Sequence, residues 1–309
     1  EINVVATMSS GKSTLINALL GQQLMPAANE ATTATIVKII DTDQDNFSAI
    51  ACDESGQVVT KLDNVTLEDM QALNADEKVS TIEIKGKIPR VSSVGMKLVL
   101  VDTPGPNNSR DKSHEEMTYK MIADSDKSLV LYVMNGQQLG INDDKILLDY
   151  VCKSMKGGGK KARERFIFAV NKMDTFKPDP QYEGPKCITK ALDNVKSCLE
   201  DREIYSPNIF PVCSLPALQK RAGFQGLCAF DITYFKEMCK YYDAMHFEKY
   251  YKYNNLPLTV RNHLNDLIGQ ASSDDDKLEF HTGIVSIEQA IAQYINKYAR
   301  TTKVFCLER

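Results

Sequence analysis

The stretch Ala6-Thr7-Met8-Ser9-Ser10-Gly11-Lys12-Ser13-Thr14 decides the fold of this chain. An apolar run at residues 2–5 precedes it and an apolar-periodic segment at residues 15–20 follows it, so it lies where a strand turns into a helix. That is the setting of a phosphate-binding loop, in which unpaired N–H groups and the helix dipole hold a polyphosphate. We expect Lys12 to reach the β- and γ-phosphates and the Ser13 hydroxyl to ligate Mg²⁺.

A plainer interpretation of the same stretch is a capped helix start. The first glycine of the usual phosphate-loop pattern is replaced by Ala6, and either Ser9 or Ser10 could serve as the N-cap. The choice between the two interpretations depends on whether further nucleotide-binding motifs occur in the right order.

Two such motifs follow apolar runs later in the chain. Asp102-Thr103-Pro104-Gly105 follows residues 98–101, where a carboxylate would hold a Mg²⁺ water and Gly105 would sense the γ-phosphate. Asn171-Lys172-Met173-Asp174 follows residues 166–170.

The second motif predicts the base. The Asp174 carboxylate can accept from the N1–H and exocyclic amine of guanine, Asn171 can reach the opposite edge of the base, and the Lys172 stem can lie on the ring. Adenine would leave the carboxylate unpaired, and sites built on buried hydrogen bonds reject such analogues strongly. Three motifs in one order at predicted strand ends therefore favour a GTP site over the capped helix.

Two more site elements are expected. Cys213-Ser214 ends the strand at residues 209–213, where a further motif would contact the base through its backbone. A threonine in the polar segment at residues 22–34 should close over the γ-phosphate and complete the Mg²⁺ shell, and Thr32 and Thr33 are both candidates.

Apolar strands alternate with helices along the chain, which predicts an α/β phosphate-loop GTPase fold: a mostly parallel central sheet covered by helices on both faces. The other strands are expected at 35–40, 47–52, 58–62, 82–88 and 128–134, and the helices at 15–20, 66–75, 115–123, 141–155, 188–199 and 286–299. The helix at 141–155 should bury Ile146, Leu147, Tyr150 and Val151. Residues 272–276 read as an acidic loop.

Composition excludes several classes of protein. A net charge of −4 over 309 residues predicts no bulk attraction to nucleic acid or anionic lipid. Eight cysteines without a C-x-x-C pair and four scattered histidines argue against a zinc site and indicate reduced thiols in a cytoplasmic protein. No apolar run reaches the roughly 20 residues that a membrane span needs, and no signal peptide is visible.

The motifs resemble the dynamin superfamily, specifically bacterial dynamin-like proteins. The residues that carry the likeness are Met8 to Thr14, Leu24-Met25-Pro26 leading to Thr32-Thr33, Asp102-Thr103-Pro104-Gly105-Pro106-Asn107, Asn171-Lys172-Met173-Asp174 and Ile209 to Ser214. Ras-like enzymes orient the attacking water with a glutamine directly after the switch glycine, but here that residue is Pro106, which has no side-chain amide.

The resemblance implies a full set of site residues. Ser9, Thr33 and Gly105 would serve catalysis, and Ser13, Thr33 and Asp102 would hold Mg²⁺. The residues expected to contact GTP or GDP are Met8, Ser9, Ser10, Gly11, Lys12, Ser13, Thr14, Asn171, Lys172, Asp174 and Ser214. A monovalent cation, K⁺ or Na⁺, would supply positive charge that no arginine in residues 22–34 provides.

The resemblance also implies an organisation and a role. Residues 1–300 would form the GTPase domain, with a helical insertion or extension at 227–270, and residues 301–309 would begin a neck; no stalk is discernible. The protein would hydrolyse GTP while forming a homodimer across the nucleotide, and remodel a membrane that it contacts peripherally through parts outside this sequence, without binding nucleic acid. The alternative is a nucleotide-gated scaffold for a protein partner such as replication machinery, with slow or no hydrolysis.

Overall fold

The computed structural model describes residues 1–6, 9–26, 35–91, 98–102, 128–138, 142–157, 165–176, 187–224, 232–233 and 250–299. Statements about the structure refer to these residues. The predicted helix at 115–123 and most of residues 227–249 lie outside them.

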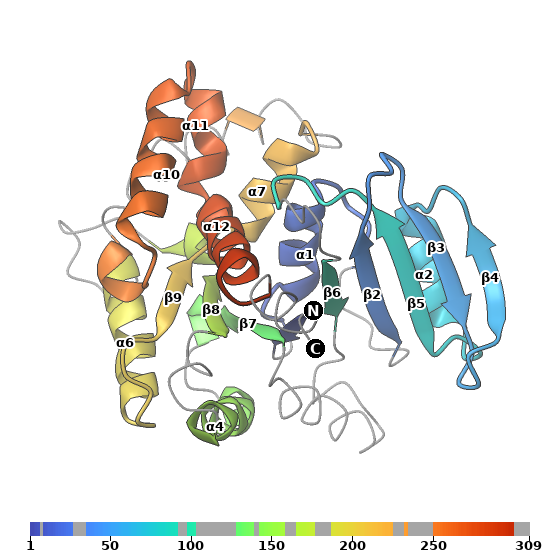
Figure 1. Ribbon diagram of the computed structural model, residues 1–309, viewed down its shortest axis with the longest axis horizontal. Helices are drawn as coiled ribbons and strands as arrows, with labels where there is room; N and C mark the ends of the chain where they lie inside the picture. The colour runs from blue at the N-terminus through green and yellow to red at the C-terminus, as the bar shows by residue number, and fades with distance from the viewer. Residues whose placement is uncertain are drawn as a thin grey trace, which may run out of the picture.

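The described strands form one nine-stranded sheet in the order β4-β3-β5-β2-β6-β1-β7-β8-β9 (Figure 1). Its strands are β1 Ile2–Ala6, β2 Ile36–Asp41, β3 Ser48–Cys52, β4 Val58–Leu62, β5 Thr81–Gly86, β6 Val99–Asp102, β7 Leu129–Asn135, β8 Phe166–Asn171 and β9 Asn208–Pro211. The run β6-β1-β7-β8-β9 is parallel throughout, whereas β2 pairs antiparallel with β6 and the β3–β4 hairpin pairs antiparallel with β5. The prediction of a mostly parallel sheet is confirmed.

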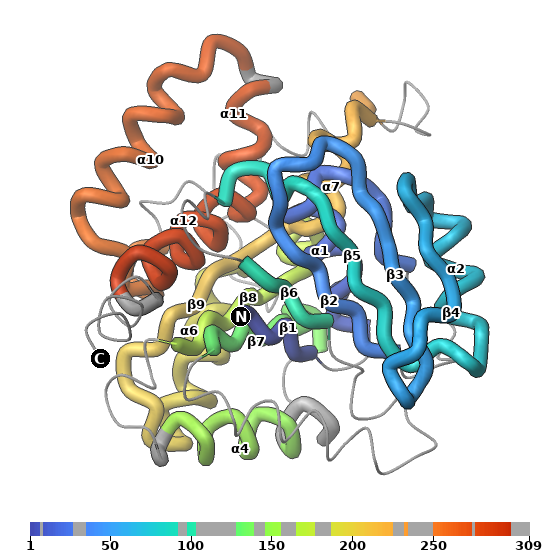
Figure 2. Tube along the Cα trace, turned by 45° about the vertical axis from the view of Figure 1, so that its right-hand side comes forward, coloured from blue at the N-terminus to red at the C-terminus, as the bar shows by residue number. Residues whose placement is uncertain are grey.

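Helices cover both faces of this sheet (Figures 1 and 2). They are α1 Lys12–Leu20, α2 Leu67–Ala75, α4 Asn142–Gly157, α6 Ile188–Glu200, α7 Ser214–Arg221, α10 Leu258–Gln270, α11 Asp274–His281 and α12 Ile284–Tyr294, which continues as a π-helical segment over Ile295–Ala299. Short 3₁₀ turns occupy Gly136–Gln138, Met173–Thr175 and Tyr251–Tyr253.

The central strands β1, β7 and β8 are mostly apolar because each one contributes to two cores. Along β7, Leu131 and Val133 face a core shared with α1, α7 and α12, whereas Val130 and Tyr132 face a core shared with α4 and α6. Successive side chains of a strand point to opposite faces, so a strand covered on both sides needs apolar residues at every position.

Two sequence-based expectations on helices are wrong. Ile146 of α4 is 60% exposed, and the buried residue beside Leu147 is Leu148. Residues 272–276 are not a loop, because Asp274 begins α11 and the Ser273 side chain caps it by accepting from the Asp276 N–H at 3.1 Å. Acidic residues in the first turn of a helix interact favourably with its dipole, which accounts for this cluster.

A buried ion network joins the helices on the α1 side of the sheet. Arg221 of α7 donates to both carboxylate oxygens of the fully buried Glu288 at 2.7 and 3.0 Å, to Glu279 at 2.7 Å, and to the carbonyl of Ala18 at the end of α1. Arg90 adds a second cation to Glu279 at 2.7 Å. Burial alone would lower the pKa of Arg221, but its carboxylate partners raise it, so the guanidinium stays charged.

Gly283 fixes α12 against the end of β9. Its φ of +79° lies in the left-handed region, and a Cβ added there would stand 2.1 Å from the carbonyl oxygen of Pro211. The Thr282 carbonyl accepts from the Cys213 N–H at 2.8 Å beside this contact. The backbones of the α12 start and the β9 end therefore approach as closely as only glycine permits.

Gly283→Ala should lower the free energy of unfolding by more than about 2 kcal/mol, because it adds a steric clash to the left-handed strain. Gly223→Ala is the matched control, since its φ is +66° but a Cβ there meets no atom of the described residues within 4 Å. It should cost only about 1 kcal/mol. Urea denaturation measures both, and equal losses would contradict the close approach at Gly283.

Candidate functional site

The phosphate-binding loop joins β1 to α1. Gly11 is the residue before the first helical turn, its φ is +84°, and no side chain caps the helix. The alternative prediction, a helix capped by Ser9 or Ser10, is therefore wrong. A helix start whose N–H groups receive no side-chain cap is suited to an anion.

Gly11 has no room for a side chain. A Cβ at this position would stand 2.4 Å from Nδ2 of Asn171 and 4.0 Å from Cε of Lys172. The motif at the end of β8 therefore packs directly on the phosphate loop, and the Lys172 stem lies over Gly11. The phosphate loop and the motif after β8 therefore form one continuous surface at the carboxyl ends of β1 and β8. This surface is the nucleotide edge of the sheet.

Asn171 makes this connection with its side-chain amide. Its Nδ2 donates to the carbonyl of Ser10 at 2.9 Å and, at 3.4 Å, to that of Gly11. Its Oδ1 accepts from the N–H and the hydroxyl of Ser214 at 3.1 and 2.8 Å. The amide is thus engaged within the protein on both its nitrogen and its oxygen side, and the expected contact of Asn171 with the edge of the base stays a prediction.

Asp174 lies in the 3₁₀ turn directly after Lys172, which has a φ of +62°. Burial raises the pKa of the Asp174 carboxyl, and a backbone N–H and the charge of Lys172 oppose this shift only in part. A desolvated carboxylate gains strongly from a ligand that offers N–H donors.

Lys12 and Asp102 form an ion pair across the loop, with Nζ and Oδ1 2.8 Å apart and both side chains about 15% exposed or less. Asp102 ends β6, which pairs parallel with β1. Ser13 and Thr14 are half-buried in the first turn of α1. The structure thus brings the predicted phosphate lysine and the predicted Mg²⁺ carboxylate together.

Asn135 belongs to the site although the sequence did not single it out. It ends β7, its side chain is 2% exposed, and its Nδ2 donates to the carbonyl of Ser9 at 3.2 Å. Ser9 itself is exposed and has a φ of +58°. The signal in the sequence that could have identified Asn135 is a polar residue at the end of an otherwise apolar strand.

Several predicted site residues cannot be placed. Met8, Thr33 with its alternative Thr32, and Gly105 lie outside the described residues. The part of the nucleotide crevice that these residues would line is therefore not described.

The described residues contain no group of three His, Cys, Asp or Glu side chains that could hold a metal ion. Mg²⁺ in nucleotide sites takes only one or two protein oxygens and fills its shell with phosphate and water. The Ser13 hydroxyl and the Asp102 carboxylate are hard oxygen donors of that kind. The donor set therefore fits a phosphate-bound Mg²⁺ and not a protein-only metal cage.

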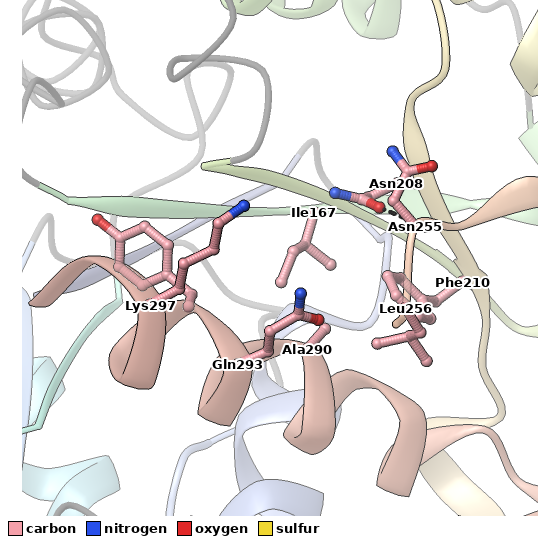
Figure 3. Close-up of a pocket in the computed structure, with 9 residues that line it drawn as sticks. Ile167, Asn208, Phe210, Asn255, Leu256, Ala290, Gln293 and Lys297 are labelled. Atoms are coloured by element: carbon pink, nitrogen blue, oxygen red, sulfur yellow. Dashed lines mark hydrogen bonds between the residues drawn. The ribbon is translucent and has the colours of Figure 1, made fainter. Parts of the chain in front are cut away.

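A small pocket of about 80 Å³ lies at the amino ends of β8 and β9 (Figure 3). Ile167 and Asn208, at the starts of β8 and β9, line it together with Leu256 and residues of α12 such as Gln293. The phosphate loop and Asp174 lie instead at the carboxyl end of β8, where Asn171 contacts the loop. The pocket is therefore separate from the nucleotide edge.

The chain is 22% identical over 230 residues to a probable transmembrane GTPase of the FZO-like, chloroplastic type from Arabidopsis thaliana. The match covers 74% of this chain but only 20% of that protein. Among the helices of the described ranges, none is long and apolar enough to cross a membrane.

Two solved chains share the fold. Both come from an oligomerised bacterial dynamin pair that provides a mechanism for the long-range sensing and tethering of membranes. Their TM-scores are 0.52 and 0.50 at 15% and 16% identity, and the matches cover 99% and 98% of this chain but 44% and 46% of theirs. The chain thus spans less than half the length of the proteins it matches.

A family model described as "Dynamin family" matches residues 2–172, from β1 and the phosphate loop to the end of β8. The match covers more than half of the chain, and the chain therefore belongs to the dynamin family.

Proposed function

We propose that this chain is the GTP-binding and GTP-hydrolysing unit of a dynamin-like protein. The observation that carries the proposal is the amide of Asn171, which ties the phosphate loop to Ser214 at the end of the strand that leads into the turn of Asp174. A polyphosphate cradle and a carboxylate for guanine thereby belong to one rigid edge. The GTPase relative and the dynamin-family match support it.

The residues of the loop would bind the phosphates. Backbone N–H groups of residues 8–14 and the ammonium of Lys12 would neutralise them, and Ser13, Asp102 and Thr33 would hold Mg²⁺, which shields charge on the transferred phosphoryl group. Lys12 would then exchange its Asp102 partner for phosphate. Ser9, Thr33 and Gly105 would position the attacking water, with K⁺ or Na⁺ as the remaining positive charge.

The domain organisation follows the same pattern as in the resemblance. Residues 1–300 form the GTPase domain, α10 belongs to the helical addition at 227–270, and residues 301–309 begin a neck. Two copies would dimerise across the nucleotide, in line with the oligomeric state of the bacterial dynamin pair. Hydrolysis would drive association with, and remodelling of, a membrane surface.

Lys12→Ala should abolish GTP binding and phosphate release, because it removes the cation that meets the β- and γ-phosphates. Titration of a fluorescent guanine nucleotide and a phosphate-release assay, with and without K⁺, measure both properties. Lys196→Ala is the control, since Lys196 pairs with Glu200 at the surface, where its side chain is 40% exposed. A wild-type protein that releases no phosphate at high concentration would refute the proposed activity, and retained binding by Lys12→Ala would refute the loop assignment.

Asp174→Asn should weaken GDP binding on the order of 100-fold, because two charge-assisted hydrogen bonds to guanine are lost. It should favour xanthosine diphosphate, whose C2 carbonyl accepts from the new amide.

In the wild type, guanine needs the ionised carboxylate of Asp174, and burial raises the pKa of this carboxyl. GDP affinity should therefore fall as the pH drops through this raised pKa, and calorimetry should find no such loss in Asp174→Asn. An unchanged base preference would place the base elsewhere.

The full-length protein should sediment with phosphatidylethanolamine–phosphatidylglycerol vesicles more strongly with a non-hydrolysable GTP analogue than with GDP. Nucleotide-dependent dimerisation would multiply weak single contacts with lipid, which accounts for the expected difference. Protein that stays in the supernatant with both nucleotides would contradict the membrane role and favour the protein-scaffold alternative.

A further inference from the structure

Two asparagines stand side by side at the ends of neighbouring strands, and both reach the phosphate loop. Asn135 ends β7 and Asn171 ends β8, and the two residues are direct partners in the parallel register. Asn135 donates to the carbonyl of Ser9, and Asn171 donates to those of Ser10 and Gly11. Three successive carbonyls of the loop are thus held by side-chain amides.

The orientation of the Asn135 amide is fixed by its own turn. Its Oδ1 accepts from the Gln137 N–H at 3.0 Å, which only the oxygen end of the amide can do. The Nδ2 end therefore faces the loop, where it donates to Ser9 at 3.2 Å and to Oε1 of Gln138 at 3.1 Å. With 2% exposure, the side chain has little freedom to turn away.

Ser9 needs such support. Its φ of +58° is unusual for a residue with a side chain and costs about 1 kcal/mol relative to the ordinary region. Such a conformation persists when surrounding contacts determine it. Within the described part of the loop, the Asn135 amide holds the Ser9 carbonyl in this way.

A held carbonyl also aims the next N–H group. The peptide unit is planar and trans, so the carbonyl of Ser9 and the N–H of Ser10 point in opposite directions. Asn135 therefore turns the Ser10 N–H away from the β7 end, as Asn171 does for the N–H groups of Gly11 and Lys12. Successive N–H groups turned to one side form an anion-binding concavity.

We propose that Asn135 is a positioning residue for GTP hydrolysis, which acts by fixing Ser9 and the Ser10 N–H. The inference rests on the proposed function. Asn171 and the glycine at position 11 already fix the inner part of the loop, so losing Asn135 would release its outer part, where the proposed catalytic Ser9 lies. Its contribution should therefore fall more strongly on turnover than on nucleotide affinity.

Asn135→Ala should lower kcat about 10-fold, the effect of one buried hydrogen bond, while KM and the Kd for GDP change less than about threefold. Asn254→Ala is the matched control. Asn254 is a 7% exposed asparagine that donates to the Tyr250 carbonyl at 3.2 Å and accepts from the Leu256 N–H at 3.3 Å, beside the pocket at the opposite end of the sheet. It should lose similar thermal stability and keep its kcat.

Two results would overturn the inference: an unchanged kcat in Asn135→Ala, or a loss of GDP affinity by the same factor as kcat, which marks general support of the fold. If the alanine variant does not fold, Asn135→Ser keeps a polar group that is too short to reach Ser9 and answers the same question. A wild-type protein that binds no GDP refutes the proposed function itself. If the wild-type enzyme hydrolyses GTP and the variants at position 135 have the same kcat, only the role of Asn135 is refuted.

Discussion

The side-chain amide of Asn171 is the contact on which the rest of the site depends. It joins backbone atoms of the phosphate loop to Ser214 at the start of α7, so three segments separated by more than 40 residues share one amide. The glycine at position 11 follows from it, because any side chain there would collide with Nδ2. A buried amide with all its hydrogen bonds made holds its neighbours in one arrangement, since displacing it leaves several polar groups unsatisfied.

The Arg221 network gives this edge a firm connection to the C-terminal helices. Arg221, the last residue of α7, donates to the Ala18 carbonyl near the C-terminal end of α1. The two helices that begin at the Asn171 contact are therefore joined again at this guanidinium. Glu288 of α12 completes it. Removing one partner of such a pair would leave an uncompensated buried charge, which ties the position of α12 to that of the nucleotide edge.

Much of the fold and of the site could be predicted from the sequence, because both follow from local patterns. Apolar runs predicted the parallel strands, and parallel strands bring the residues after their ends to one edge, as found for Lys12, Asp102 and Asp174. The use of Asn171 could not be predicted, because its Nδ2 donates to backbone carbonyls that lie about 160 residues away in the sequence. Ile146 fits the apolar period of α4 but lies on its exposed face, since helix rotation depends on packing that the period alone does not fix.

Neutral amides suit this loop better than charged side chains would. A carboxylate at position 135 or 171 would repel the phosphates that the loop is proposed to hold, and an ammonium would offer them a second, competing cation. An amide can instead hold a carbonyl and leave the field of the helix N-terminus and of Lys12 unchanged. Apart from Lys172 and Asp174, which are expected to meet the base, the charge of the site lies on the Lys12–Asp102 pair, whose two members are the groups expected to meet phosphate and Mg²⁺. The loop is thus held in shape by neutral contacts, while the Lys12–Asp102 ion pair beside it is the one that ligand binding would rearrange.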